Sequence, residues 1–127
     1  MPIKLELIEN GYIVWFHVEG TWNSDDISTA KTDAHRVFSQ AHHTIHALVD
    51  LRRATVNMAL IRATQQIIGG EPLPNSGQIA VVGVARLMRM LVEPILRVIS
   101  TDPITFFDTI EDAKKYLRQH IPQDKHA

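Results

Sequence analysis

The feature that most constrains the fold is a short, unbroken apolar run at residues 79–84, rich in β-branched side chains. Such a run is typical of a strand covered on both faces, which occurs mainly in parallel sheets flanked by helices. Stretches with the helical spacing of apolar residues lie on either side, at 58–68 and 86–99. Strands that alternate with helices of this length require crossover connections, so the sequence predicts an α/β fold with a largely parallel sheet.

The chain begins with an expected hairpin. Residues 3–8 alternate apolar and charged side chains, and Asn10-Gly11 is a strong turn signal because both residues tolerate positive φ. The predicted order is β-β-α-β-α-β-α-β-α in one domain spanning 1–127, mostly parallel with an antiparallel N-terminal hairpin. Strands are expected at 3–8, 12–19, 45–51, 79–84 and 103–107, and helices with apolar stripes at 27–41, 58–68, 86–99 and 110–117.

The composition excludes several classes of protein. The 127 residues include no cysteine, which excludes disulfides, thiolate metal sites and a cysteine nucleophile. A formal net charge of −1 lacks the basic excess of a nucleic-acid-binding protein. Residues 1–6 lack the apolar segment of a signal peptide, and charged residues interrupt the longest apolar stretch, at 86–99. We therefore expect a cytoplasmic protein that neither spans a membrane nor binds nucleic acid.

Two stretches carry a resemblance to a known family. The first is Ala47-Leu-Val-Asp50-Leu-Arg-Arg-Ala-Thr55, and the second is Phe106-Phe-Asp-Thr-Ile-Glu-Asp-Ala-Lys-Lys-Tyr-Leu117. Together with the element order, they resemble the STAS, or SpoIIAA-like, anti-sigma-factor antagonist domains, and more closely the uncharacterised bacterial single-domain branch of that fold. The resemblance implies a non-enzymatic regulatory or ligand-sensing module, most simply one that acts by binding a protein.

One segment departs from the family's pattern. Phosphorylatable STAS domains carry Asp-Ser or Ser-Ser at the start of the helix that follows the Asp-bearing strand. The corresponding stretch here, Val56-Asn57-Met58-Ala59, has no hydroxyl, and Thr55 lies slightly too early. The expected module therefore lacks the phosphorylatable serine.

Polar residues follow several of the predicted strands. The carboxyl ends of parallel strands and the N-termini of the following helices share one edge of a sheet, so these residues should gather there. Helix N-termini and arginine side chains suit an anion such as a phosphate, a carboxylate or an acidic peptide. Alternatively, Arg52 and Arg53 form a solvated turn, and Asp50 and Asp108 cap the neighbouring backbone. The candidate binding residues are Asp50, Arg52, Arg53, Thr55, Asn57, Arg86, Arg89, Asp108 and Thr109.

The expected helix at 86–99 is apolar around most of its circumference. A helix outside a small sheet has only one side to bury, so part of this apolar surface would remain exposed. The exposed part predicts a homodimer, a protein partner or a lipid-like ligand in an apolar pocket. The anionic head group of such a ligand would bind Arg86 and Arg89. An ordinary core helix is the alternative. Pro94 should kink this helix or begin a second segment. The candidate interface residues are Leu87, Met88, Met90, Leu91 and Ile95.

Other kinds of chemistry have little support in the sequence. His42, His43 and His46 have a spacing that suits a metal on a helix, but they fall between a predicted helix and strand, so no metal site is predicted. Nucleophile-elbow, phosphate-loop and dinucleotide-binding signatures are missing, and no cofactor is predicted. An enzyme that uses Asp50 or Asp108 as an acid or base is a further alternative.

Overall fold

A five-stranded mixed sheet organises the chain, with the strand order β1-β2-β3-β4-β5. The computed structural model describes residues 3–55, 74–99 and 104–122, except the side chains of Val92 and of 95–99. The predicted helix at 58–68, together with Asn57, lies outside the described residues. The strands are β1 (Ile3–Ile8), β2 (Ile13–Gly20), β3 (Ile45–Ala54), β4 (Ser76–Val82) and β5 (Ile104–Phe107), and the α-helices are α1 (Ser24–Ser39), α3 (Arg86–Ile99) and α4 (Ile110–Arg118).

The N-terminal hairpin joins β1 and β2 in antiparallel register. Its turn is one 3₁₀ segment, η1 (Glu9–Gly11), in which φ is +53° at Glu9, +58° at Asn10 and +84° at Gly11. The turn predicted from Asn10-Gly11 is confirmed, and its left-handed backbone begins one residue earlier, at Glu9.

The other strand pairs are all parallel, which confirms the predicted α/β fold. Asp50 on β3 is in register with Val82 on β4, and Val82 is in register with Phe107 on β5. The carboxyl ends of β4 and β5 therefore lie level with Asp50 along one edge, which we call the strand-end edge, while β3 continues beyond it to Ala54. This is the edge on which the predicted binding residues depend.

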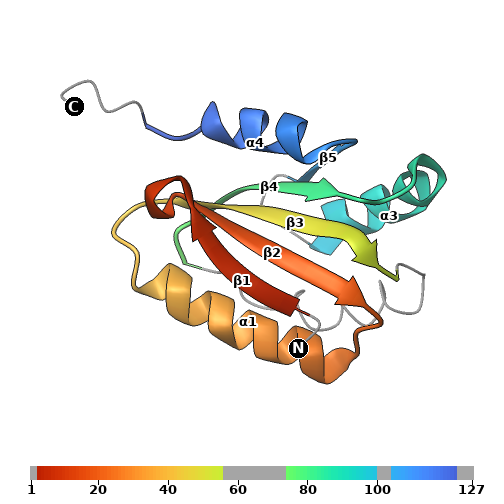
Figure 1. Ribbon diagram of the computed structural model, residues 1–127, viewed down its shortest axis with the longest axis horizontal. Coiled ribbons are helices and arrows are strands. Elements are labelled where there is room, and N and C mark those ends of the chain that lie inside the picture. The colour runs from red at the N-terminus through yellow and green to blue at the C-terminus, as the bar shows by residue number, and fades with distance from the viewer. Residues whose placement is uncertain (1–2, 56–73, 100–103, 123–127) are drawn as a thin grey trace.

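Helices cover both faces of the sheet. In Figure 1, α1 lies along one face, α4 lies along the other, and the first turns of α3 stand beyond the carboxyl end of β4. Asn23 caps α1 through a reciprocal pair of hydrogen bonds with Asp26, and the Thr109 hydroxyl caps α4 by accepting from the Asp112 N–H. Towards the sheet, the two helices bury Ile27, Ala30, Ala34 and Phe38 from α1, and Ile110, Ala113 and Leu117 from α4.

Strand β3 is longer than predicted. The sequence suggested an end at Leu51, whereas β3 continues to Ala54, so assigning Arg52 and Arg53 to a turn is wrong. The reason is that β2 also continues, past a register shift between His17 and Glu19, and pairs Glu19 with Arg53. These pairings and the hydrogen bond from the Thr55 N–H to the Gly20 carbonyl, 2.8 Å, hold the segment against β2.

Candidate functional site

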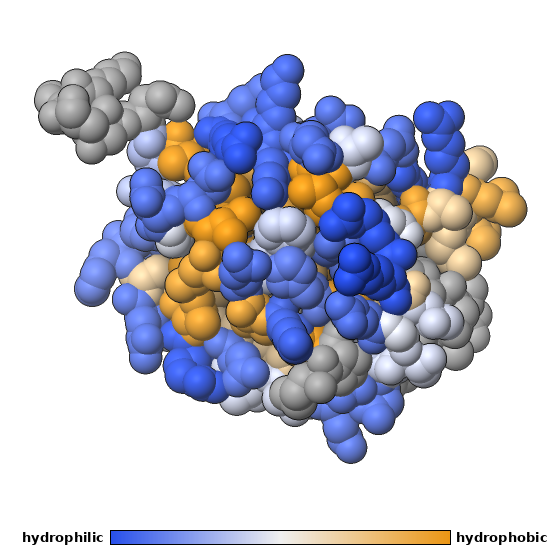
Figure 2. Space-filling view, viewed as in Figure 1, coloured by the Kyte–Doolittle hydropathy of each residue, from blue (hydrophilic) through white to orange (hydrophobic). Residues whose placement is uncertain are grey.

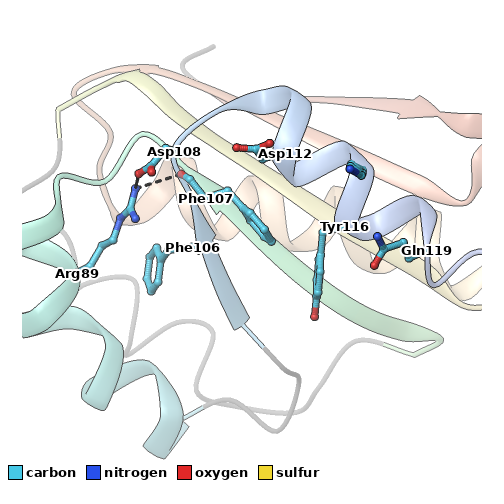
Figure 3. A pocket seen from close by; sticks show the side chains of 8 residues that line it. Arg89, Phe106, Phe107, Asp108, Asp112, Tyr116 and Gln119 are labelled. Carbon is cyan, nitrogen blue, oxygen red and sulfur yellow. Dashed lines mark hydrogen bonds and ion pairs between the residues drawn. The ribbon is translucent and has the colours of Figure 1, made fainter.

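Arg89 fixes the start of α3 to the strand-end edge. Its Nε donates to the Val84 carbonyl (2.8 Å), and its Nη2 donates to the Phe107 carbonyl (3.1 Å) and to Asp108 Oδ1 (2.8 Å). Figure 3 shows this side chain reaching from α3 across to Asp108. One guanidinium group therefore joins the segment after β4, the end of β5 and the start of α3.

Asp108 is bound by two arginines. Besides Arg89, the exposed Arg86 approaches Asp108, with 3.7 Å between Nη2 and Oδ2. The hydrogen bond and charge of Arg89, helped by Arg86, lower the pKa of the Asp108 carboxyl below its ordinary value. Asp108 is therefore ionised at neutral pH. The next residue, Thr109, serves as the N-cap of α4.

A second ion pair joins Asp50 and Arg52. Arg52 donates from Nε to Oδ1 (3.0 Å) and from Nη2 to Oδ2 (2.9 Å), and its backbone N–H also donates to Oδ1. The Trp15 indole N–H donates to Oδ2 at 3.4 Å. Burial raises the pKa of Asp50, but the bonds and charge of Arg52, with the Trp15 bond, outweigh burial and lower the pKa. Asp50 is a buried carboxylate with a complete set of donors.

Gly83 lies between these two clusters. Its φ is +99°, and a Cβ there would lie 2.4 Å from the backbone nitrogen of Arg52. Only glycine lets the chain after β4 lie this close to β3, because any other residue would collide with the β3 backbone. The predicted common edge is confirmed for Asp50, Arg86 and Asp108. They form two separate ionic clusters, Asp50 with Arg52 and Asp108 with Arg86 and Arg89.

The arginines of this edge are already bound to carboxylates of the same chain. Besides the pairs described above, Arg53 Nη1 lies 3.7 Å from Glu19 Oε1, and both side chains are exposed. Thr55 contributes backbone contacts, since its carbonyl accepts from the Trp22 indole N–H at 3.2 Å. An external anion would therefore meet arginines whose charge these carboxylates already balance, and anion binding at this edge stays a prediction.

The exposed side of α3 is apolar. Leu87 is 75% exposed, Met90 73% and Leu91 55%, while Met88 is half-buried. The spacing of 87, 90 and 91 places the three exposed residues on one helical face, which we call the α3 stripe. Figure 2 shows apolar side chains standing out at the end of the molecule where Figure 1 places α3.

Pro94 lies inside α3, so it does not begin a second segment, and the alternative that it kinks the helix stays a prediction. The helix continues to Ile99, although Pro94 has no N–H for the Met90 carbonyl. The Ile95 side chain, the fifth predicted interface residue, lies outside what the structure describes. The predicted apolar surface of this helix is therefore observed through its first turns.

An open pocket of about 380 Å³ lies where α4 meets β5 and Arg89. Its rim is polar, whereas the predicted lipid-like ligand requires a closed apolar pocket lined by α3. Sequence reasoning proposed only Arg89 and Asp108 of its lining residues for binding. The sequence did hold a signal for the α4 side of the pocket, because residues 112, 115, 116 and 119 have the spacing of one helical face. The lining residues are Arg89, Phe106, Phe107, Asp108, Asp112, Lys115, Tyr116 and Gln119.

The histidines near β3 contact protein groups. His43 stacks on Tyr12, and His46 is buried, its Nδ1 accepting from the Gln78 N–H (2.9 Å) and its Nε2 donating to the His120 carbonyl (3.2 Å). In the part of the chain that the structure describes, no three His, Cys, Asp or Glu residues are grouped as metal ligands would be. Across those same ranges, no helix has both the length and the apolar character to cross a bilayer.

Comparison with known proteins identifies the class of fold. An uncharacterized protein of the DUF3478 family, which has a SpoIIAA-like fold and comes from Shewanella loihica PV-4, superposes with a TM-score of 0.67. The match covers 91% of this chain and 91% of that one, at 14% sequence identity. This chain therefore has a SpoIIAA-like fold, as the resemblance of its two sequence stretches predicted. No protein-family profile matches the sequence, and no curated protein matches it.

Proposed function

We propose that this chain is a non-enzymatic regulatory module that acts by protein contact, and that a second copy of the chain binds the α3 stripe. The observation that carries the proposal is the exposure of Leu87, Met90 and Leu91 on one helical face. Complete burial of a side chain of this kind contributes about 1.5–3 kcal/mol, so covering all three favours association substantially. Methionine also adapts to irregular partner surfaces.

The charges beside the stripe favour a second copy as the partner. Arg86 and Glu93 carry opposite charges and lie seven residues, about two turns, apart along the same flank of α3. A two-fold axis brings identical patches together, so two antiparallel α3 helices would place Arg86 of each copy near Glu93 of the other. The same operation would pack one stripe against the other.

The carboxylates of the strand-end edge support a role other than catalysis. A general acid at neutral pH needs a raised pKa, usually from burial without a cationic partner. Asp50 and Asp108 have lowered pKa values, because each carboxylate is held by arginine. The edge is better suited to hold α3 and the strand ends in place for a partner than to transfer protons.

Light scattering coupled to size-exclusion chromatography tests the proposal. We expect the wild-type chain to be a dimer and Leu91→Glu to be a monomer, because the substitution places a charge at the centre of the buried stripe. Leu7→Glu is the matched control, since Leu7 is also exposed (52%) but lies on β1, and it should remain dimeric.

A wild-type monomer across the accessible concentration range would contradict the second-copy partner. Dissociation of the Leu7→Glu variant to the same extent as Leu91→Glu would instead place the contact elsewhere on the molecule. Circular dichroism of each variant separates dissociation from loss of folding.

A further inference from the structure

The pocket beside α4 has walls of aromatic rings. Phe106, Phe107 and Tyr116 line it, and all three side chains are half-buried, so part of each ring remains accessible. The Phe107 and Tyr116 rings are 5.1 Å apart and inclined by 44°, and the Arg89 guanidinium lies over the Phe106 ring at 5.9 Å. Figure 3 shows the labelled rings between Arg89 on one side and α4 on the other.

These walls are held in place by hydrogen bonds and ion pairs of the lining residues. The Tyr116 hydroxyl donates to Gln78 Oε1 at 2.8 Å, which ties the ring to β4. Arg89 and Asp108 neutralise each other, and Arg89 is further held by two backbone carbonyls. A flat ring that enters the pocket therefore meets pre-positioned aromatic surfaces, which favour offset or edge-to-face stacking.

Two charged groups on the rim have no partner among the residues that the structure describes. The Asp112 and Lys115 side chains line the pocket, and neither forms a hydrogen bond or ion pair with another described residue. In this they differ from Arg52, Arg53, Arg86 and Arg89, which all bind carboxylates. Because Asp112 and Lys115 are three residues apart on α4, their side chains project from the same face, about 5–6 Å apart at Cβ.

This arrangement determines which charges a ligand needs. A ligand with only an anionic group would bind Lys115 but lie beside the Asp112 carboxylate, which repels it. A ligand with only a cationic group meets the reverse conflict. A molecule with an ammonium and a carboxylate on the same carbon atom satisfies both side chains at once, through charge-assisted hydrogen bonds.

We propose that this pocket binds a free aromatic α-amino acid. Its carboxylate binds Lys115, its ammonium binds Asp112, and its ring stacks on Phe106 and Tyr116. The pocket volume of about 380 Å³ lies within the range of small-molecule sites. The pocket includes Arg89 of α3 but none of the three residues of the α3 stripe, so this proposal goes beyond the proposed function and does not depend on self-association.

Titration of the purified full-length chain with L-phenylalanine, followed by ¹H–¹⁵N NMR, tests the proposal. We expect saturable shifts in α4 and β5. Three analogues serve as ligand controls: 3-phenylpropanoate lacks the ammonium, 2-phenylethylamine lacks the carboxylate, and L-alanine lacks the ring. Each should bind at least about tenfold more weakly, because each loses one of the three contacts. The absence of saturation with L-phenylalanine, or equally tight binding of 3-phenylpropanoate, would overturn the proposal.

Variants of α4 provide the second part of the test. Lys115→Gln and Asp112→Asn should each weaken L-phenylalanine binding by about tenfold. Lys114→Gln and Glu111→Gln are matched controls on the same helix, since Lys114 lies over the Trp15 ring and neither residue lines the pocket. Equal weakening in the controls would show a general electrostatic effect and reject the assigned contacts. Thermal unfolding of each variant distinguishes lost binding from lost stability.

Discussion

Helices α1 and α3 both have an apolar face, but only that of α1 is turned towards the sheet. In α1, Ile27, Ala34 and Phe38 are buried, whereas Leu87 and Met90 of α3 are exposed. The difference follows from position, because α1 lies along a face of the sheet, whereas the first turns of α3 stand beyond the strand ends (Figure 1). Hydrophobic periodicity thus identifies an apolar face, but it does not identify what covers that face.

The largest expected effect is a difference in stability between variants in the apolar faces of α1 and α3. Phe38→Ala should lower the free energy of unfolding by about 3–5 kcal/mol, because it leaves a cavity at a side chain that is 1% exposed. Leu91→Ala should change it by no more than about 0.5 kcal/mol in the monomer, since Leu91 is already in water. Urea denaturation at a concentration that keeps the chain monomeric measures both. Similar losses for the two variants would contradict the comparison.

A smaller effect concerns how α3 is held in place. Arg89→Leu should lower the free energy of unfolding by about 2–3 kcal/mol, because it removes charge-assisted hydrogen bonds to the Val84 and Phe107 carbonyls. Arg86→Leu should cost no more than about 1 kcal/mol, since Arg86 is 85% exposed and its contact is long. Urea denaturation of both variants provides the measurement. If Arg86→Leu proves the more damaging of the two, Arg89 is not the anchor of α3.

The start of α1 is stabilised locally, through its own capping box. Asn23→Ala should therefore lower the free energy of unfolding by about 1 kcal/mol, because the Asp26 N–H loses its acceptor. Asn23→Ser restores a capping oxygen and should recover most of this loss. Thermal unfolding of the three proteins measures the effect, and an Asn23→Ala variant as stable as the wild type would show that the cap contributes nothing.

The last prediction concerns the pH at which the contacts that hold α3 and α4 in place are lost. Burial lowers the pKa of His46 below 6.5, although the His120 carbonyl opposes the shift and the charge of His120 adds to it. The His46 ring then binds a proton more readily in the unfolded chain than in the folded one. Its contribution to the free energy of unfolding is therefore complete above about pH 6.5 and declines as the pH falls below this value. Arg89 and Arg86 lower the pKa of Asp108 below 3.8, so the contribution of Asp108 to the free energy of unfolding is lost only below about pH 4.

Acid should therefore weaken the contact of His46 with the His120 carbonyl, just after α4, before it weakens the contact of Arg89 on α3 with Asp108. Urea denaturation at pH values between about 4 and 7.5 tests this order. The wild type should lose stability as the pH falls through this range, and His46→Gln should remove part of that dependence. An unchanged pH dependence in His46→Gln would exclude His46 as its source.

Much of the fold was predictable from local patterns. The alternation in β1, the Asn10-Gly11 turn and the apolar run at 79–84 each gave the correct element, because period, turn chemistry and β-branching act over a few residues. The length of β3 was not predictable. Arg52 and Arg53 read locally as a turn, and they join the sheet because β2 supplies pairing partners from more than thirty residues away.

The candidate site was only partly predictable. The rule that parallel strands end at one edge correctly brought Asp108 together with Arg86 and Arg89. The rule gave no indication that these arginines would bind the chain's own carboxylates, or that Lys115 and Tyr116 would line a pocket. Those relations depend on how far apart α4, β5 and α3 finally lie.

The sequence by itself determined the α/β class, the hairpin and the presence of an apolar surface on the helix that begins at Arg86. The tertiary structure alone decided that Leu87, Met90 and Leu91 face solvent, and that Asp112 and Lys115 line a pocket beside aromatic rings without a partner among the described residues. The physical reason is range. Propensity, capping and periodicity act between residues close in the chain, whereas exposure and charge pairing depend on which distant segments come together.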